Sequence, residues 1–321
     1  MTTNPFMKAA RFHQYGGADV IRYEDAPVPE VTEDEVLIKV AATSFNPFDA
    51  KLRSGAFKQF LPIELPFTPS VNVSGTVVKA GDSVTTFREG DNVFAYLDVT
   101  RNGAAAEYVV SKAVHIAHAP KTFDLHESAA VPSVALTAWQ ALFDYGRLKS
   151  GQRVLITAAA GGVGTLAVQL AKWKGAYVIG TASEKSFSML EQLGIDEIID
   201  YKKQSVVEAL KNKVDVIFNL SPAGKDEISN LLQLLNEGGT FISAVSPADE
   251  TIAKELGVKA VRLNSHPDAE QLTQIAELLD AGVLKPVITE RTKLSELAAV
   301  HQKFDDGKVS GRVLIIVDGV N

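Results

Sequence analysis

The stretch 153-RVLITAAAGGVGTLAVQLAKWKG-175 decides the fold of this chain of 321 residues. It begins with an apolar run that is typical of a parallel strand buried on both faces. Small residues and glycines follow, and apolar residues at three-and-four spacing then predict a helix that Gly175 ends. A glycine motif between a strand and a helix carries much more information than the same motif elsewhere.

The glycine turn predicts a site for a phosphate-bearing dinucleotide. Against the pattern G-x-G-x-x-G the three motif positions are Ala159, Gly161 and Gly164, and Gly162 and Val163 complete the turn. Gly161 leaves room for a pyrophosphate, Gly164 lets the helix pack closely on the strand, and the helix N-terminus offers free N–H groups. The alternative is an ordinary tight turn with no ligand.

The order of the segments predicts two domains. From Arg153 onwards strands and helices alternate, which indicates a doubly wound parallel sheet. Before that point, short strands separated by Gly-Asp turns indicate a small barrel or sandwich. The apolar closing segment RVLIIVD is expected to return to this first domain. We therefore expect the first domain at 1–125, a nucleotide-binding domain at 126–265 and a return segment at 266–321.

Composition limits the classes of partner. The net charge of −7 gives no broad basic surface and argues against nucleic acid and anionic membranes as partners. The absence of cysteine excludes disulfides, thiolate metal ligands and thiol nucleophiles. No apolar run approaches the length needed to span a membrane, and the first residues lack the pattern of a signal peptide. We expect a cytoplasmic protein.

The end of the second strand of the wound sheet favours NADPH over NADH. A site for NADH usually has an acidic residue there that accepts hydrogen bonds from the ribose hydroxyls. This chain instead has Thr181, Ala182 and Ser183. Ser183 and Lys185 can donate hydrogen bonds to a 2′-phosphate, and Tyr201 ends the next strand nearby. The alternative for Lys185 is a solvated helix residue.

With these motifs the chain resembles a zinc-free medium-chain dehydrogenase/reductase of the quinone oxidoreductase (zeta-crystallin-like) group. The resemblance spans nearly the full length and rests on an ordered series of segments: KAARFHQYGG, YEDAPVPE, SFNPFDAKLRSG, GDNVFA, VPSVALTAWQAL, AAAGGVG, IIDY and VSGRVLIIV. It implies a GroES-like β-barrel catalytic domain built from both ends of the chain. It also implies a Rossmann domain and an active site in the cleft between the two.

The resemblance also implies that the catalytic zinc is lost. Zinc-dependent relatives bind the metal with a Cys and a His-Glu pair, and these positions fall here on Asn46, Val71 and Asn72. Because thiolate and imidazole donors are missing, we expect no metal site. Alcohol oxidation without a Lewis acid is a poor proposal. A quinone or an enone can accept hydride at carbon while hydrogen bonds stabilise its oxygen.

Two residues are expected at the reacting centre. The resemblance places Asn46 beside the nicotinamide, where its amide can both donate and accept. The alternative is that Asn46 only forms a turn before Pro47. Tyr96 is expected to border the cleft together with Asp49 and Lys51, but none of the three is a convincing proton donor.

Further cofactor contacts are expected from the resemblance and from the strand ends. Thr137 resembles a residue near the nicotinamide ribose, although a plain helix threonine is the alternative. Carboxyl ends of parallel strands face the ligand crevice. The residues at the ends of the fourth and fifth strands are Asn219, Leu220, Ala244 and Val245. Relatives have Asp-Thr-Val-Gly-Gly after the fourth strand, and commonly glycine where this chain has Ser70.

The sequence therefore predicts an NADPH-dependent reductase of quinones or α,β-unsaturated carbonyls that acts by direct hydride transfer. The same fold supports a double-bond reductase that uses quinones poorly. An alternative of another class is a non-catalytic NADPH-binding protein, either a redox sensor or a structural protein of crystallin type. Residues 258–264 are expected to form an exposed edge strand that pairs two copies into a homodimer.

Overall fold

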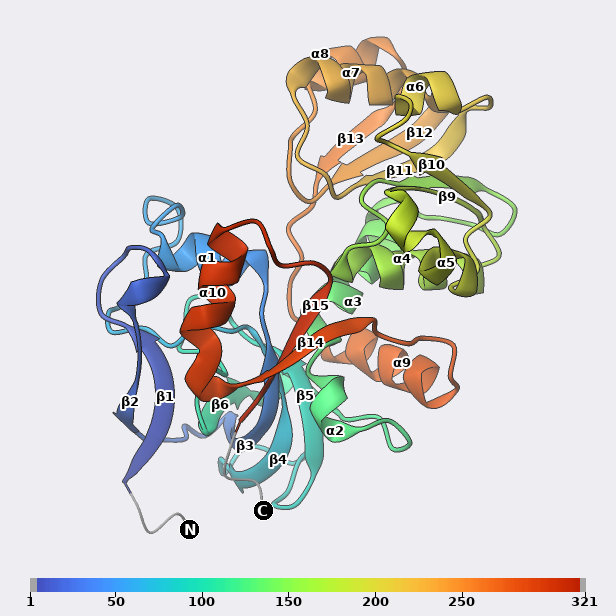
Figure 1. The fold of residues 1–321 in the computed structure, drawn as a ribbon. Helices are drawn as coiled ribbons and strands as arrows, with labels where there is room; N and C mark the ends of the chain where they lie inside the picture. Colours follow the sequence, from blue (N-terminus) through green and yellow to red (C-terminus); the bar gives the residue numbers. More distant parts are fainter. Residues whose placement is uncertain (1–4, 318–321) are drawn as a thin grey trace. The chain divides into compact units, whose positions relative to one another are not determined.

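The computed structural model describes residues 5–317, and the chain divides into two compact units (Figure 1). Unit 1 comprises the chain up to Ser133, Pro267–Gly282 and the residues from Pro286 on. Unit 2 comprises Val134–His266 and Val283–Lys285. The sequence-based boundaries near residues 125 and 265 lie close to these two crossings of the chain.

Unit 1 is built on a mixed sheet with the strand order β14-β15-β3-β4-β5-β7, and β6 also pairs with β3. A separate antiparallel pair is formed by β1 and β2. The strands are β1 (Phe6–Phe12), β2 (Ile21–Pro27), β3 (Glu35–Ser44), β4 (Asn72–Ala80), β5 (Asn92–Tyr96), β6 (Tyr108–Lys112), β7 (Ile116–His118), β14 (Ile288–Lys293) and β15 (Arg312–Ile316). The helices are α1 (Pro47–Arg53), α2 (Leu125–Ser128), α9 (Ala269–Asp280) and α10 (Leu297–Asp305).

Strand β3 organises the core of unit 1. Almost every residue of β3 is buried, because the strand pairs with β4, β6 and β15 and has apolar neighbours on both faces. Val36, Ile38 and Val40 alternate into one apolar cluster, to which α10 contributes Leu297 and Val300. The apolar closing strand β15 therefore lies beside β3, so that the two ends of the chain share one sheet.

Unit 2 is a parallel sheet of six strands with helices on both faces. The strand order is β10-β9-β8-β11-β12-β13, which is the 3-2-1-4-5-6 order of a doubly wound dinucleotide-binding sheet. The strands are β8 (Arg153–Ile156), β9 (Tyr177–Ala182), β10 (Glu197–Asp200), β11 (Val214–Asn219), β12 (Leu235–Ser243) and β13 (Lys259–Arg262). The predicted fold class is thereby confirmed.

Figure 1 shows α4 and α5 on one side of this sheet and α7 and α8 on the other. The helices are α4 (Gly162–Trp173), α5 (Phe187–Gln192), α6 (Val206–Ala209), α7 (Lys225–Gln233) and α8 (Glu250–Glu255). Helix α3 (Pro132–Trp139) enters the unit and continues as a π-helix over Gln140–Tyr145. Helix α4 ends at Trp173 with Lys174 as its C-cap, and Gly175 follows with a φ of +81°, as the sequence predicts.

Helix α4 packs on β8 with almost no space between their backbones. A Cβ atom at Gly164 would lie 2.6 Å from the carbonyl oxygens of Ala158 and Ala159, which no side chain tolerates. The methyl group of Ala159, at the first motif position, occupies room left by Gly180 in β9, where an added Cβ would lie 2.7 Å from it. A neighbouring glycine therefore accommodates the alanine that replaces the first glycine of the motif.

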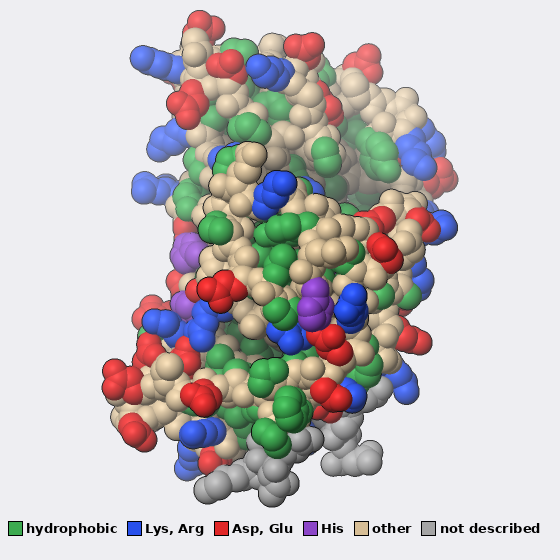
Figure 2. All heavy atoms as spheres, turned by 90° about the vertical axis from the view of Figure 1, so that its left-hand side faces the viewer, with side chains coloured by type: hydrophobic (Ala, Val, Ile, Leu, Met, Phe, Trp, Pro, Cys, Tyr) green, Lys and Arg blue, Asp and Glu red, His purple; other side chains and the backbone are tan. Residues whose placement is uncertain are grey.

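The surface carries charges of both signs. On the face shown in Figure 2, Lys and Arg side chains are interspersed with Asp and Glu side chains, and no continuous basic region is formed there. Within residues 5–317, no helix is both long enough and apolar enough to cross a lipid bilayer.

Ser70 has a backbone conformation that favours glycine. Its φ is +78°, in the left-handed region, where a Cβ atom meets the following carbonyl at a cost of roughly 1–2 kcal/mol. The conformation is held because the N–H of Ser70 donates to Oδ1 of Asp49 at 3.2 Å and its carbonyl accepts from the N–H of Ala104 at 2.7 Å. Among the described residues, the buried hydroxyl of Ser70 has no hydrogen-bond partner. A glycine at this position would avoid both the strain and the unsatisfied hydroxyl.

We expect Ser70→Gly to stabilise the protein by about 1 kcal/mol, because relief of the strain and removal of an unsatisfied hydroxyl outweigh the added entropy of the unfolded chain. Ser74→Gly is the matched control. Ser74 also has a buried hydroxyl without a partner, but it lies within strand β4 and is not among the residues with positive φ. Ser74→Gly should therefore destabilise. Chemical denaturation measures both changes, and a destabilised Ser70→Gly variant would contradict the assignment of strain.

Candidate functional site

A cavity of about 840 Å³ lies at the carboxyl edge of the parallel sheet in unit 2. The loops that follow β8, β10 and β11 line it together with Thr181 of β9 and helices α6 and α7. The residues in its wall include Thr157, Ala158, Thr181, Tyr201, Gln204, Ser205, Asn219, Ser221, Glu227 and Leu231. The cavity is within the size range of small-molecule and cofactor sites. It lies where β8 and β11 adjoin, the point at which the strand order reverses and ligands bind in doubly wound sheets.

A buried polar chain fixes the wall of this cavity. The hydroxyl of Thr157 donates to Oδ1 of Asn219 at 2.8 Å and accepts from the N–H of Leu220 at 2.8 Å. Nδ2 of Asn219 donates to the carbonyl of Ser221 at 3.0 Å and to Oγ of Ser243 at 3.1 Å. Three neighbouring strands are thus tied together at their carboxyl ends. Both amide hydrogens of Asn219 are engaged in holding the loops.

The glycine turn is anchored to the same edge of the sheet. The N–H of Ala158 donates to the Thr181 hydroxyl at 2.9 Å, and the N–H of Ala159 donates to the Thr181 carbonyl at 3.0 Å. Gly161 is the N-cap of α4, and the first turn of this helix contains no acidic residue. Its first N–H groups have no partner within the helix and attract an anion.

The turn fits a dinucleotide pyrophosphate. Gly162 and Val163 are the first residues of α4, so their N–H groups belong to the unsatisfied first turn. At Gly161 an added Cβ would have its nearest neighbour, the Ala158 carbonyl oxygen, at 3.3 Å. An alanine at this position would therefore require the Ala158 carbonyl to shift by a few tenths of an ångström. The absence of a side chain at Gly161 is consistent with the approach of a ligand.

The end of β9 carries the residues expected to select the cofactor. Ser183 is buried and caps a short 3-10 helix, Glu184–Ser186, in which Lys185 is exposed. Tyr201 is 57% exposed and lines the cavity. Lys203, which the sequence analysis missed, lies 2.9 Å from Oε2 of Glu184 and 3.5 Å from Oδ2 of Asp200. The hydrogen bond with Glu184 raises the pKa of Lys203. The acid that follows Ser183 is therefore paired with a lysine.

Among the expected cofactor contacts, Tyr201 and Asn219 line the cavity, whereas Ser183, Lys185, the expected residues of the glycine turn and four others are not part of its wall. The N–H of Leu220 is used by Thr157, and the N–H of Ala244 donates to the Asn219 carbonyl at 3.1 Å. Val245 donates its N–H to Oγ of Ser243 at 3.3 Å. Thr137 donates its hydroxyl to Oγ of Ser265 at 3.0 Å. Their roles toward a cofactor remain predictions.

In unit 1, Asn46 lies between β3 and α1. It is the N-cap of α1 with Pro47 at the first helical position, so it does form the turn that was considered as an alternative. Its N–H donates to Oδ2 of Asp49 at 2.8 Å, and its side-chain oxygen accepts from Nη1 of Arg312 at 2.6 Å and from the Ser133 hydroxyl at 3.3 Å. Asn46 therefore belongs to a buried polar network as well as to a turn.

Val71 and Asn72, which stand where zinc-dependent relatives have their His-Glu pair, lie in the same region of unit 1. Oδ1 of Asn72 accepts from the N–H of Ser133 at 2.7 Å, and its Nδ2 donates to Oγ of Ser44 at 3.1 Å. Val71 offers only hydrocarbon. Two engaged amides and an apolar side chain do not fit zinc, which binds thiolate, imidazole or carboxylate. Within residues 5–317, no group of three or more His, Asp or Glu side chains is placed to hold a metal.

Two opposite charges flank Asn46. Burial raises the pKa of Asp49 to about 6, although the hydrogen bonds from Asn46 and Ser70 and the charge of Arg312 oppose this shift. Burial lowers the pKa of Arg312 to about 10, and Asp49 opposes that shift. Both groups are therefore charged at neutral pH. Tyr96, the last residue of β5, is buried and pairs with Asn72 in the β4–β5 register. Arg312 was missed by the sequence analysis.

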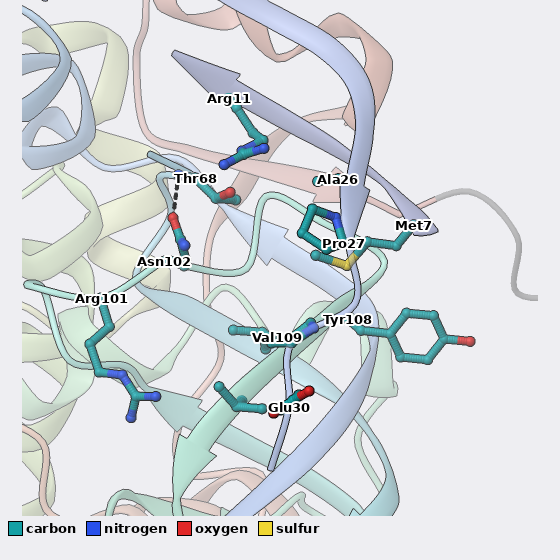
Figure 3. A pocket seen from close by; sticks show the side chains of 13 residues that line it. Met7, Arg11, Ala26, Pro27, Glu30, Thr68, Arg101, Asn102, Tyr108 and Val109 are labelled. Carbon is teal, nitrogen blue, oxygen red and sulfur yellow. Dashed lines mark hydrogen bonds between the residues drawn. The ribbon is translucent and has the colours of Figure 1, made fainter. Parts of the chain in front are cut away.

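A second pocket lies in unit 1 and holds about 210 Å³ (Figure 3). Two of its polar side chains are already engaged, since Arg11 donates to the Pro66 carbonyl at 3.1 Å and Arg101 pairs with Glu35. Figure 3 also shows the side chain of Asn102 directed at Thr68. The backbone N–H of Thr68 donates to Oδ1 of Asn102 at 2.8 Å. The pocket is smaller than most ligand sites, so the cavity in unit 2 is the better candidate.

Comparison with known proteins agrees with this architecture. The family described as alcohol dehydrogenase GroES-like domain matches residues 32–121, and the family described as zinc-binding dehydrogenase matches residues 193–315. The quinone oxidoreductase of Mus musculus is 33% identical over 337 residues, which covers 98% of this chain and 99% of the mouse protein. The chloroplastic quinone-oxidoreductase QR1 of Triphysaria versicolor is 34% identical and covers 96% of this chain and 98% of its own length.

Solved structures of quinone oxidoreductases are also similar to this chain. The quinone oxidoreductase from Coxiella burnetii superposes with a TM-score of 0.88 at 32% identity, covering 97% of this chain and 99% of its own chain. The quinone oxidoreductase of Pseudomonas syringae has a TM-score of 0.85 at 26% identity.

The two glycines of the turn should respond differently to alanine. Gly161→Ala should leave the stability within about 1 kcal/mol of the parent, because the backbone conformation suits alanine and the Ala158 carbonyl needs to shift by only a few tenths of an ångström to admit the methyl group. It should weaken NADPH binding about tenfold or more by blocking the pyrophosphate, which is roughly 1.4 kcal/mol. Gly164→Ala should instead destabilise the fold. Fluorescence titration with NADPH and thermal unfolding measure both, and unchanged affinity in Gly161→Ala would contradict the placement of the pyrophosphate.

Proposed function

Since the chain belongs to the quinone oxidoreductase group of the medium-chain dehydrogenase/reductase family, and is therefore an NAD(P)H-dependent oxidoreductase, we propose that it reduces quinones or α,β-unsaturated carbonyl compounds with NADPH and without zinc. The observation that carries the proposal is the side-chain-free turn at the start of α4, tied to Thr181 in the wall of the 840 Å³ cavity.

The turn and the cavity would divide the binding of the cofactor between them. The pyrophosphate would lie on the first N–H groups of α4, and the adenosine half would occupy the cavity beside Tyr201. When bound, NADPH supplies hydride to an electron-poor carbon. The protein residues hold the cofactor and orient it, which accounts for a large share of the rate in such reactions.

Three features support NADPH over NADH. Ser183 and the exposed Lys185 can donate to a 2′-phosphate. Glu184, the acid nearest in sequence, is paired with Lys203 at 2.9 Å and is therefore a poor acceptor for ribose hydroxyls. The positive charge of Lys203 also offsets the repulsion between Glu184 and an added phosphate.

We propose that the protein binds no zinc, because the side chains at the three metal-ligand positions lack suitable donor atoms. Asn46 and Asn72 have engaged amides and Val71 has no donor atom, so an acceptor oxygen would be stabilised by hydrogen bonds alone. Asn46 and Tyr96 remain the residues that we propose for the reacting centre.

We also propose a homodimer formed through β13. This strand lies at the edge of the parallel sheet, hydrogen-bonded to β12 on one side only. An unpaired strand edge is a template for a second copy of the same strand. Light scattering should give twice the mass of one 34.5 kDa chain, and a monomeric mass at micromolar concentration would contradict the proposal.

The activity is tested by anaerobic mixing of the protein with NADPH and a panel of acceptors, namely 1,4-benzoquinone, an ortho-quinone and an open-chain enone. Loss of the nicotinamide absorbance with at least one acceptor is expected. Quinone turnover that is slow beside enone turnover would identify a double-bond reductase. Tight NADPH binding with no oxidation by any acceptor would support a sensor or a structural protein instead.

The same assay tests the choice of cofactor. We expect kcat/KM for NADPH to exceed that for NADH, and Lys185→Gln to reduce the ratio about tenfold, because a charged hydrogen bond is worth roughly 1.5–3 kcal/mol. Lys254→Gln is the matched control, since Lys254 is an exposed lysine of α8, which follows β12, and is not part of the segment after β9. Equal ratios in the parent and both variants would contradict the assignment of the 2′-phosphate site.

A further inference from the structure

One wall of the 840 Å³ cavity in unit 2 is formed by helices α6 and α7, which pack against each other (Figure 1). Val206 and Val207 of α6 and Leu231 of α7 give this wall an apolar surface. Glu227 and Asn230 of α7 belong to the same wall. A few polar side chains beside an apolar surface are typical of a site that holds a ligand by its faces and orients it by its polar edge.

The apolar residues of α7 set the direction of its two polar side chains in this wall. Ile228, Leu231 and Leu232 are buried in the core of unit 2, so the remaining face of the helix is turned outward. Glu227 and Asn230 are three positions apart on that face, with about 5–6 Å between their Cβ atoms. Both are exposed, and among the described residues neither side chain has a hydrogen-bond or ion-pair partner. Both are therefore free to bind a ligand.

An adenine base presents complementary groups along one of its edges. Its 6-amino group is a donor and its N7 atom is an acceptor, whereas a 6-oxo purine such as hypoxanthine has an acceptor in place of the amino group. A carboxylate only accepts hydrogen bonds, and an amide nitrogen donates them. Glu227 therefore matches the 6-amino group, and Asn230 matches N7.

We propose that Glu227 is a specificity-determining residue that selects adenine over 6-oxo purines in the cofactor, and that Asn230 donates a hydrogen bond to N7 of the same base. The proposal rests on the proposed function, in which the adenosine half of NADPH occupies this cavity beside Tyr201. It adds recognition of the base to recognition of the pyrophosphate and of the 2′-phosphate. The faces of the base contact the apolar surface of α6 and Leu231.

The charge of Glu227 makes the contact selective. A 6-oxo group brings its oxygen against the carboxylate, so that two acceptors face each other without a donor. A hydrogen bond from the 6-amino group to a charged acceptor is instead stronger than one between neutral groups. Glu208, the other acid of the wall, is engaged with Ser205 in the capping box of α6. Contacts of this kind discriminate between bases by about tenfold to 100-fold in affinity, and the exposure of Glu227 to water favours the lower end of this range.

The test compares NADPH with reduced nicotinamide hypoxanthine dinucleotide phosphate, which carries hypoxanthine in place of adenine. We expect the parent protein to have about tenfold lower kcat/KM with the hypoxanthine cofactor. The difference should lie in a higher KM with an unchanged kcat, because the nicotinamide is the same. A readout without turnover is the binding of 5′-AMP and 5′-IMP, measured by calorimetry. 5′-AMP should bind about tenfold more tightly.

Glu227→Gln is the decisive variant, because it keeps the size of the side chain, removes its charge and provides an amide nitrogen that can donate to a 6-oxo group. The ratio of kcat/KM between the two cofactors should therefore approach one. Asp226→Asn is the matched control, since Asp226 is an exposed acid in the same first turn of α7 that is not part of the cavity wall. Both variants lose one charge near the N-terminus of the helix, so an effect on helix stability is shared.

Asn230→Asp tests the second contact. A carboxylate cannot donate to N7, and N7 is common to both bases. The variant should therefore weaken the binding of both cofactors by a similar factor and leave their ratio unchanged. An unchanged affinity for both cofactors in Asn230→Asp would overturn the assignment of N7 to Asn230.

The outcomes separate the inference from the proposed function. Equal kcat/KM for the two cofactors in the parent, or equal ratios in the parent and Glu227→Gln, would overturn the inference in an enzyme that still works. A change of the ratio in Asp226→Asn as large as in Glu227→Gln would also overturn it. A parent protein that oxidises NADPH with no acceptor would instead overturn the proposed function. If that parent nevertheless binds 5′-AMP more tightly than 5′-IMP and Glu227→Gln abolishes the difference, the role of Glu227 is supported without the reaction. Where Glu227→Gln does not fold, Glu227→Ala takes its place.

Discussion

The close contact between the start of helix α4 and strand β8 is the constraint on which the nucleotide-binding unit depends. Gly164 lies against two carbonyl oxygens, so the helix axis cannot move away from the strand or rotate without opening a gap. This contact aims the N-terminus of α4 at the carboxyl edge of the sheet. Thr157, Asn219 and Ser243 then tie the ends of three strands at that edge, so that the helix terminus and the cavity wall have fixed positions.

Much of unit 2 could be predicted from the sequence because its signals are local. The apolar run of β8, the helical spacing of α4 and the glycines between them lie within about twenty residues, and each requires only its neighbours. Local signals are less informative for short elements. The segment SVVEALK forms only the single turn Val206–Ala209, closed by a capping box between Ser205 and Glu208. Local propensity indicates such a helix but does not set its length.

The polar network around Asn46 could not be predicted, because it joins residues from four distant parts of the chain. Ser44, Asn72, Ala130, Ser133 and Arg312 meet only after β3 and β15 have paired. An arginine at the start of an apolar strand indicates a buried charge but not its partners. The positive φ of Ser70 could not be predicted either, because the hydrogen bonds with Asp49 and Ala104 impose it and serine as a residue type does not favour it. Nothing in the sequence marked Lys203 as a residue near the cofactor site, except that two lysines follow Tyr201.

The packing of Ala159 against Gly180 has a consequence for how this sequence can evolve. Only one of the two positions has room for a methyl group. A larger residue at position 180 would therefore disrupt the turn unless residue 159 were already glycine. The order of the two mutations matters, because the reverse order passes through a chain with two methyl groups in one space. Glycine at position 159 would remove one of the two close contacts at position 180, and the Cδ1 atom of Ile195, 2.6 Å from an added Cβ, would have to move as well.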